Sequence, residues 1–258
     1  MEIAPGIHHF DTGPFNWYLI EEEGRLTLVD AGFPGHYRTF LAGVRSLGHH
    51  PKDLEAILLT HAHADHTGFA ERVRRETGAP VFVHEADRSA IGRVLQLPWR
   101  GLLSNAWRPF IRSMLGHAIG AGVFQMPSIA DARTFGDGER LDVPGRPRVI
   151  HTPGHTPGEV SFFLADRGVL LSGDTLVTRN LMTGAMGGPQ LCSRVLNDSD
   201  PEARRSLDRL RELGRVTILP GHGKPWVGAM SEAVESARRQ PALSAPGHPP
   251  AEPRGRRP

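Results

Sequence analysis

Residues 60–68 read THAHADHTG. They follow an apolar run of strand length, LEAILLT at 54–60, and they precede a segment with the pattern of a short helix, TGFAERVRRET at 67–77. Thr67 can cap that helix, and Gly68 permits a close approach of the backbone. The stretch therefore predicts a loop at the end of a buried strand, crowded with polar side chains.

Four side chains in this loop are of the kinds that bind metal ions. In extended backbone, residues two apart point the same way, so His61 and His63 can reach one ion together. The chain then turns, and Asp65 and His66 face the other side of the loop. Imidazole and carboxylate groups suit zinc, and also iron or manganese. A surface loop that is histidine-rich by chance is the alternative, and four such residues within six positions argue against it.

Three later residues stand alone at the mouths of strands, each beside Gly or Pro. They are His155 in HTPGHTPG (151–158), Asp174 in LLSGDTL (170–176) and His222 in LPGHGKP (219–225). Taken singly, Asp174 could cap a helix and either histidine could be an ordinary loop residue. Together with the first cluster they predict a site with more than one metal ion.

The rest of the chain alternates between strand and helix patterns, which predicts a layered α/β fold. Residues 86–127 interrupt this alternation with apolar residues at helical spacing, and we interpret them as an insertion of two or three helices. Residues 241–258 are rich in Pro, Ala and Arg and have little to bury, so we expect a disordered tail after a domain spanning 1–240.

Composition limits the class of protein. The 258 residues are 39% hydrophobic and carry a formal net charge of +2, which is typical of a globular protein and predicts no nucleic-acid partner. Cys192 is the only cysteine, has no motif around it, and is interpreted as an ordinary thiol. The sequence does not show the basic start and apolar run of a secretory signal, or an apolar run long enough for a membrane span. We therefore expect a cytoplasmic protein.

The motifs HAHADH, GHT, SGD and PGHG, in this order, resemble those of the metallo-β-lactamase superfamily, with a ligand set like that of glyoxalase II. The resemblance runs from about Ile7 to about Trp226, with residues 86–127 outside it. It implies a four-layer αββα sandwich with the metal site at one edge between the two sheets, here with a helical insertion.

The resemblance also implies a role for each ligand. His61, His63 and His155 would hold a first metal ion, and Asp65, His66 and His222 a second, with Asp174 bridging the two. Asp30 in the segment DAG (30–32) matches a residue that supports the metal loop from behind the ligands.

The implied activity is that of a metallo-hydrolase with two divalent ions, most simply zinc, with iron or manganese as alternatives. A hydroxide bridging the ions would attack an ester, thioester, lactone or amide, and Asp65 could orient it or carry its proton. A mononuclear iron persulfide dioxygenase, a nuclease of this fold and a metal-binding module without catalysis are the alternatives. After Asp174 the chain lacks the tyrosine of homoserine-lactone lactonases and the Gly-Cys-Gly-Arg type of segment associated with glutathione binding.

The sequence gives only weak signals for the residues that contact the substrate. Trp99, Trp107 and Phe110 of the insertion could line an apolar lid over a small-molecule substrate, or could simply pack the insertion onto the body. Arg179 and Asn180, after Asp174, are further candidates. Homodimerisation through the insertion stays open.

Overall fold

A computed structural model describes residues 1–92 and 99–239 of the chain. The predicted disordered tail, 241–258, lies outside these residues. The strands run β1 Glu2–Ala4, β2 Ile7–Asp11, β3 Asn16–Glu22, β4 Arg25–Val29, β5 Leu54–Leu58, β6 Val81–His84, β7 Arg133–Phe135, β8 Arg148–His151, β9 Val160–Leu164, β10 Val169–Gly173, β11 Val177–Arg179, β12 Met186–Gln190, β13 Arg215–Pro220 and β14 Trp226–Ala229. The helices run α1 Tyr37–Ser46, α2 Ala64–Thr67, α3 Ala70–Thr77, α4 Glu85–Arg88, α5 Trp99–Ser104, α6 Pro109–Gly120, α7 Asp200–Ser206 and α8 Met230–Arg239. Short 3-10 helices join them: η1 Pro34–His36, η2 Pro51–Asp53, η4 Val123–Gln125, η5 Ala165–Arg167, η6 Arg194–Leu196 and η7 Leu207–Arg209.

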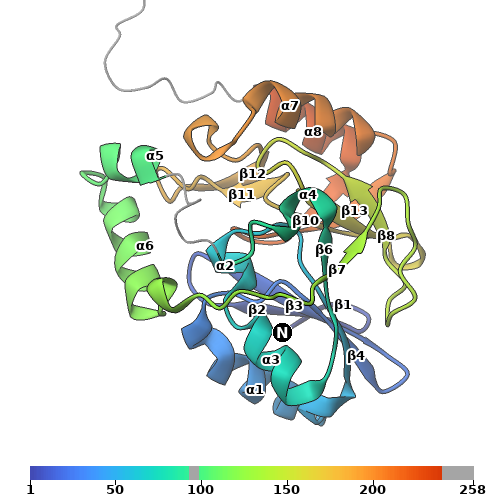
Figure 1. Cartoon of the computed structure of the whole chain (residues 1–258). Helices are drawn as coiled ribbons and strands as arrows, with labels where there is room; N and C mark the ends of the chain where they lie inside the picture. Colours follow the sequence, from blue (N-terminus) through green and yellow to red (C-terminus); the bar gives the residue numbers. More distant parts are fainter. Residues whose placement is uncertain (93–98, 240–258) are drawn as a thin grey trace, which may run out of the picture.

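Two sheets face one another between layers of helices (Figure 1). Within the described residues, the first sheet has the order β1-β2-β3-β4-β5-β6-β7 and the second the order β14-β13-β10-β9-β8. β4 to β7 are parallel neighbours, and so are β10 and β13, while the other neighbours within these two sheets run antiparallel. Helices α1 and α3 cover the first sheet, and α7 and α8 lie over the second (Figure 1). The predicted αββα sandwich is confirmed.

Successive side chains of a strand point to opposite faces of the sheet, so they pack in different layers of the core. In β3, Trp17 and Leu19 pack toward α1 and α3, whereas Tyr18 and Ile20 pack between the sheets. In β10, Leu170 packs toward α8, whereas its neighbours on both sides pack between the sheets. Because both faces of each sheet are buried, these strands read as continuous apolar runs rather than as alternating ones.

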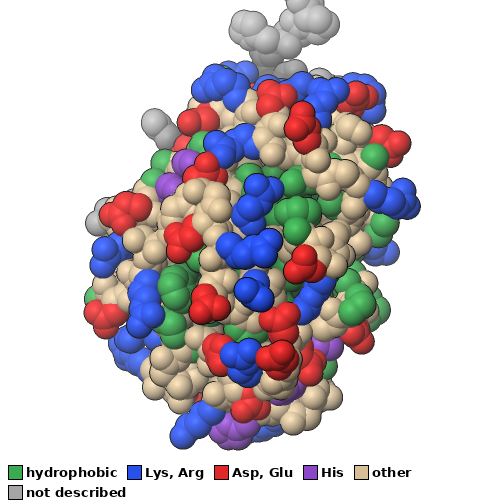
Figure 2. Space-filling view, turned by 90° about the vertical axis from the view of Figure 1, so that its right-hand side faces the viewer, with side chains coloured by type: hydrophobic (Ala, Val, Ile, Leu, Met, Phe, Trp, Pro, Cys, Tyr) green, Lys and Arg blue, Asp and Glu red, His purple; other side chains and the backbone are tan. Residues whose placement is uncertain are grey.

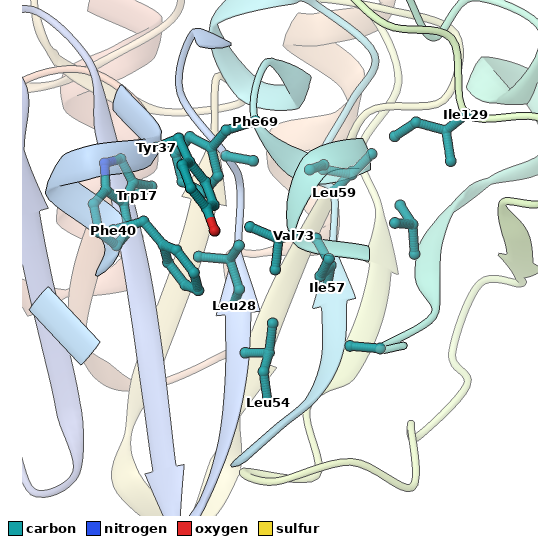
Figure 3. Close-up of a cluster of buried hydrophobic side chains, with 14 of the residues drawn as sticks. Trp17, Leu28, Tyr37, Phe40, Leu54, Ile57, Leu59, Phe69, Val73 and Ile129 are labelled. Carbon is teal, nitrogen blue, oxygen red and sulfur yellow. The ribbon is translucent and has the colours of Figure 1, made fainter. Parts of the chain in front are cut away.

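Several of the largest core side chains, Trp17, Phe40 and Phe69 among them, lie between the first sheet and its helices (Figure 3). Phe40 of α1 and Phe69, just before α3, pack against Trp17, with the Phe69 and Trp17 ring centroids 5.5 Å apart and nearly perpendicular. This cluster anchors the loop that follows β5, because Phe69 comes directly after that loop.

Within the described part of 86–127 the chain forms most of α4, then α5, α6 and η4, and α5 and α6 stand apart from the sandwich (Figure 1). The C-terminal end of the insertion contacts the body at η1. The Gly35 amide donates to the Ala121 carbonyl at 2.8 Å, and the Nε2 atoms of His36 and His117 lie 2.9 Å apart. Burial, together with the neighbouring His117, lowers the pKa of His36 to about 4.

Several local predictions were wrong. The helix expected at 67–77 starts at Ala64 and is interrupted at Gly68, where an added Cβ would meet the Gly32 carbonyl oxygen at 2.3 Å. Thr67 does not cap α3; its hydroxyl donates to the His63 carbonyl. The short strands β11 and β12 were not predicted.

The surface shows no segregation of charge on the face in Figure 2, where Lys and Arg side chains alternate with Asp and Glu. This mixture fits the small net charge. Among the helices of 1–92 and 99–239, none combines the length and the hydropathy that a membrane crossing requires.

Candidate metal centre

The seven predicted ligands converge at one edge of the sandwich, although they come from four separate loops. His61, His63, Asp65 and His66 follow β5, and His155 precedes β9. Asp174 follows β10, and His222 follows β13. Because β10 and β13 are parallel neighbours, their carboxyl ends meet at the same edge, and the side chains that follow them lie together.

Six of the seven ligands divide into two groups of three without a shared member. His61, His63 and His155 each place one nitrogen within 4.8 Å of the other two, and Asp65, His66 and His222 do the same with one oxygen and two nitrogens. In the first group, His63 Nδ1 lies 3.1 Å from His61 Nε2 and 2.9 Å from His155 Nε2. These are the same two triads that the sequence motifs imply.

Asp174 lies between the two groups. Its Oδ2 atom is 3.3 Å from His155 Nε2 and 3.1 Å from His222 Nε2, and its Oδ1 atom is 3.7 Å from His66 Nε2. The carboxylate therefore faces both triads at once, the position that a bridging ligand needs.

Hydrogen bonds behind the site fix the orientation of three of the imidazole rings. His222 Nδ1 donates to the Pro14 carbonyl at 2.7 Å, and His66 Nδ1 donates to Asp30 Oδ2 at 2.8 Å. His155 Nδ1 donates to Asn197 Oδ1 at 3.1 Å. With Nδ1 as the donor in each pair, each Nε2 faces the centre, where the neutral ring presents a lone pair, as metal-bound histidines do.

Asp30 and Glu159 support the first loop from beneath. Asp30 accepts hydrogen bonds from the Thr60 amide and hydroxyl and adopts a left-handed backbone with a φ of 61°, a strain that its contacts sustain. The predicted supporting position of Asp30 matches this geometry. Glu159 was not predicted; it lies 3.1 Å from His61 Nδ1 and accepts from the Asp174 amide.

Burial and mutual repulsion govern the charges of the first triad. Burial above all, and then the neighbouring histidines, hold the pKa values of His61 and His63 well below the usual range, so both rings are neutral and free to bind a cation.

Carboxylates govern the second triad. Burial alone would lower the pKa of His66, but Asp30 and Asp65 outweigh it and raise that pKa well above its ordinary value. Burial likewise opposes ionisation of Asp174, yet His222 and His66 hold its pKa below the usual range. Without a cation, histidinium groups balance the carboxylates, and a bound divalent ion would take over that role.

Two buried atoms of the centre lack hydrogen-bond partners among the described residues: His66 Nε2 and Asp174 Oδ1. Leaving such atoms unpaired costs about 1–3 kcal/mol each. Both belong to a further group, completed by His61, whose ligand-type atoms lie within 4.8 Å of one another. The donor set and these unpaired atoms therefore fit divalent metal ions.

Asp87 of α4 is a supporting residue that the sequence analysis missed. Its buried carboxylate accepts from the Ala62 amide at 2.9 Å, the Thr156 hydroxyl at 2.7 Å and the Gly158 amide at 2.7 Å. It thereby joins the loop of His61 and His63 to the loop of His155. No local motif marks it, because its partners are far away in sequence.

Cys192 is not remote from the chemistry. It is buried, and its sulfur lies within 4.8 Å of ligand-type atoms of His155 and Asp174. Burial, and then the Asp174 carboxylate, raise the pKa of the thiol well above its ordinary value. His84 and His151, in contrast, stack on one another 4.1 Å apart, outside the groups of ligand-type atoms.

An apolar cavity of about 200 Å³ opens onto the centre. The substrate contacts suggested by the sequence are not among its described lining residues: Trp107 is 61% exposed, and Phe110 packs against Gly184. Arg179 lies 5.8 Å from the Phe110 ring, and Asn180 accepts from the amides of Met182 and Thr183 within a turn. Trp99 begins α5, and its side chain lies outside the described part of the structure.

Comparison with known proteins gives a consistent result. The sequence profile of the metallo-beta-lactamase superfamily matches residues 11–222. The probable metallo-hydrolase YqgX of Bacillus subtilis is 31% identical over 209 residues, which cover 81% of this chain and 84% of that protein.

Two solved structures have similar folds. The metallo-beta-lactamase family protein TTHA1429 of Thermus thermophilus has a TM-score of 0.65 and 27% identity, covering 91% of this chain and 79% of that one. TTHA1623, solved in a di-iron-bound form, has a TM-score of 0.61 and 26% identity, covering 89% and 98%.

Proposed function

This chain belongs to the metallo-beta-lactamase superfamily, and from that premise we propose that it is a hydrolase with two metal ions, acting on an ester, thioester, lactone or amide. The observation that carries the proposal is the position of Asp174 between two triads of ligand-type atoms. His61, His63 and His155 would hold one ion, Asp65, His66 and His222 the other, and Asp174 would bridge them. Zinc is the proposed metal, since imidazole and carboxylate ligands suit it, and iron or manganese are the alternatives.

Two bound cations would supply a water acidified to near neutral pH and would polarise the carbonyl oxygen under attack. The chain's own residues then position the reactants. Asp65 faces the cavity, with its Oδ2 atom 3.4 Å from His222 Nε2, and can accept a proton from the attacking water. The buried hydrogen bonds to Asp30, Asn197 and Pro14 keep the histidine rings from turning.

Metal content of the purified chain tests the proposal. We expect about two metal ions per chain after mild dialysis. Asp174→Ala and His61→Ala should each lose metal and hydrolytic activity toward a panel of esters, thioesters and lactones. His84→Ala is the matched control, because it removes a partly buried imidazole outside the ligand groups, and it should keep both.

The same experiment separates the alternatives. Full activity in Asp174→Ala or His61→Ala would contradict the site assignment. About one iron per chain, no zinc and oxygen uptake with a persulfide would replace the hydrolase proposal with the dioxygenase. A nuclease is tested with single-stranded and double-stranded DNA in the same panel, for which we expect no cleavage.

A further inference from the structure

The cavity beside the metal centre has a polar end and a long apolar wall. The polar end consists of His63, Asp65, His155, Asp174 and His222. The remaining described lining residues are all hydrophobic: Phe15, Phe33, Leu102, Leu103, Met114, Leu115, Ala118, Ile119, Val123, Phe124, Leu181 and Leu196. A molecule that fills this cavity therefore meets the candidate metal site with one end and hydrocarbon with the rest.

The insertion builds most of this wall. Leu102 and Leu103 come from α5, Val123 comes from η4, and α6 supplies Met114, Leu115, Ala118 and Ile119. The wall is held against the body by the pair His36 and His117 and by the contact of Phe15 with His117, whose ring centroids are 5.6 Å apart. The apolar surface is thus a built part of the fold.

Charge is confined to the metal end. Among the described lining residues there is no Lys or Arg, and the ionisable ones are the five candidate ligands themselves. A substrate tail carrying a carboxylate or phosphate would have to bury its charge against leucine and phenylalanine, which is costly without a paired cation. The wall therefore selects against charged tails.

The rim of the cavity is apolar as well. Leu103 and Ile119 line it and are 63% and 58% exposed, which is unusual for such large hydrophobic side chains on one small surface. An apolar entrance lets a hydrocarbon chain reach the wall without crossing a polar barrier.

We infer that the substrate is a neutral acyl ester, thioester or lactone whose hydrocarbon chain lies along the insertion, with its carbonyl at the metal end. The inference rests on the proposed function and specifies its substrate class. At about 30 Å³ per water-sized group, a cavity of about 200 Å³ takes roughly six or seven such groups. Acyl chains of about six or seven carbons should therefore fit best.

The expected selectivity follows from burial of methylene groups. Each buried methylene contributes ~0.8 kcal/mol, which corresponds to roughly four-fold in kcat/KM. Lengthening an acyl chain from two to six carbons should therefore raise kcat/KM on the order of a hundred-fold. Beyond about eight carbons the gain should stop, because the cavity is filled.

The test uses the metal-loaded full chain and neutral p-nitrophenyl esters from acetate to dodecanoate, with the mono-succinate ester as the charged analogue. Ala118→Phe and Val123→Phe place a ring into the cavity and should lower kcat/KM for the hexanoate and octanoate esters at least ten-fold. The fall in kcat/KM should be much smaller for the acetate ester, whose short chain makes little contact with the wall, and the metal content should not change. Ser113→Phe is the matched control, since it adds the same ring to an exposed position of α6.

Binding of 1-octanol, measured by calorimetry, makes the inference testable without turnover. We expect the wild-type chain to bind it and Ala118→Phe to lose most of that affinity, with thermal unfolding showing that both variants are folded. Equal kcat/KM for acetate and octanoate esters, or preference for the succinate, would overturn the inference while leaving the hydrolase proposal intact. Octanol binding with no hydrolysis of any ester, thioester or lactone would overturn the hydrolase proposal instead. If the wild-type chain does not bind octanol, the inference that the apolar wall binds a hydrocarbon chain is overturned.

Discussion

The carboxylate of Asp87 connects two of the loops that form the candidate metal centre, so its removal should weaken both the fold and the site. Asp87→Ala would leave the amides of Ala62 and Gly158 buried without an acceptor, and the Thr156 hydroxyl would have to rotate. A hydrogen bond to an ionised group contributes about 1.5–3 kcal/mol. The two amides alone therefore predict a loss of about 3–6 kcal/mol in the free energy of unfolding, a large share of the ~5–15 kcal/mol that stabilises a typical protein.

Asp87→Asn should cost about half as much. Its remaining oxygen can take the place of Oδ2, which accepts from Ala62 and Thr156, while the amide nitrogen would face the Gly158 amide. The graded loss from Asp through Asn to Ala is the signature of a hydrogen-bonding role. A purely steric role would leave Asp87→Asn, which has nearly the same shape, indistinguishable from the wild type.

Urea unfolding of the metal-free protein in the presence of a chelator measures this loss without the contribution of bound metal. Zinc affinity, measured by competition with a chromophoric chelator, should fall 10- to 100-fold in Asp87→Ala, as expected when groups that orient metal ligands are removed. Glu85→Ala removes an exposed carboxylate from the same helix and is the control. An Asp87→Ala protein within about 0.5 kcal/mol of Glu85→Ala would refute the reasoning.

Two further predictions concern pH and metal. The pKa of His36 is about 4 in the folded chain and ordinary in the unfolded chain, so unfolding at a pH between about 4 and 6.5 takes up a proton. The contribution of this group to the free energy of unfolding is therefore fully present above pH ~6.5 and falls by up to about 3 kcal/mol toward pH 4. His36→Gln should flatten the pH dependence of urea unfolding over that interval, and an unchanged slope would contradict the assignment. Chelation of the wild-type protein should lower Tm on the order of 10 °C, from a binding contribution of ~4 kcal/mol at saturating metal. Asp174→Ala should show little of that shift in scanning calorimetry, and a full shift in the variant would place the metal elsewhere.

The ligands could be predicted from the sequence because their chemistry is local. His61, His63, Asp65 and His66 lie in one loop, and the alternation of extended backbone already places the first two on one side. The lone His155, Asp174 and His222 could be recognised because each follows or precedes an apolar strand and is flanked by Gly or Pro. Residues without such a setting were missed, of which Asp87 and Glu159 are the clearest cases.

The candidate substrate contacts Trp107 and Phe110 stay a prediction, and their absence from the described lining of the cavity has a related reason. Trp107 and Phe110 stand out in the sequence because they are large, yet size does not say which side of a helix faces the cavity. In the structure the side of α6 that faces the cavity carries Met114, Ala118 and Ile119 rather than Phe110. Periodicity places residues on a common face of a helix, and only the packing partner decides whether that face is buried, exposed or open to a ligand.

The sequence by itself determined the kinds of groups available for binding metal, their order along the chain and a layered α/β architecture, since each depends on residue type and on patterns within short segments. The αββα arrangement of those layers was implied by the resemblance of the motifs to a known family. The tertiary structure alone decided that four loops meet at one edge, that Asp174 stands between two triads, that Asp87 ties two loops together and that the insertion forms an apolar wall. These features depend on contacts between residues far apart in sequence, such as Asp87 and Gly158, and such contacts exist only after the sheets have paired and packed.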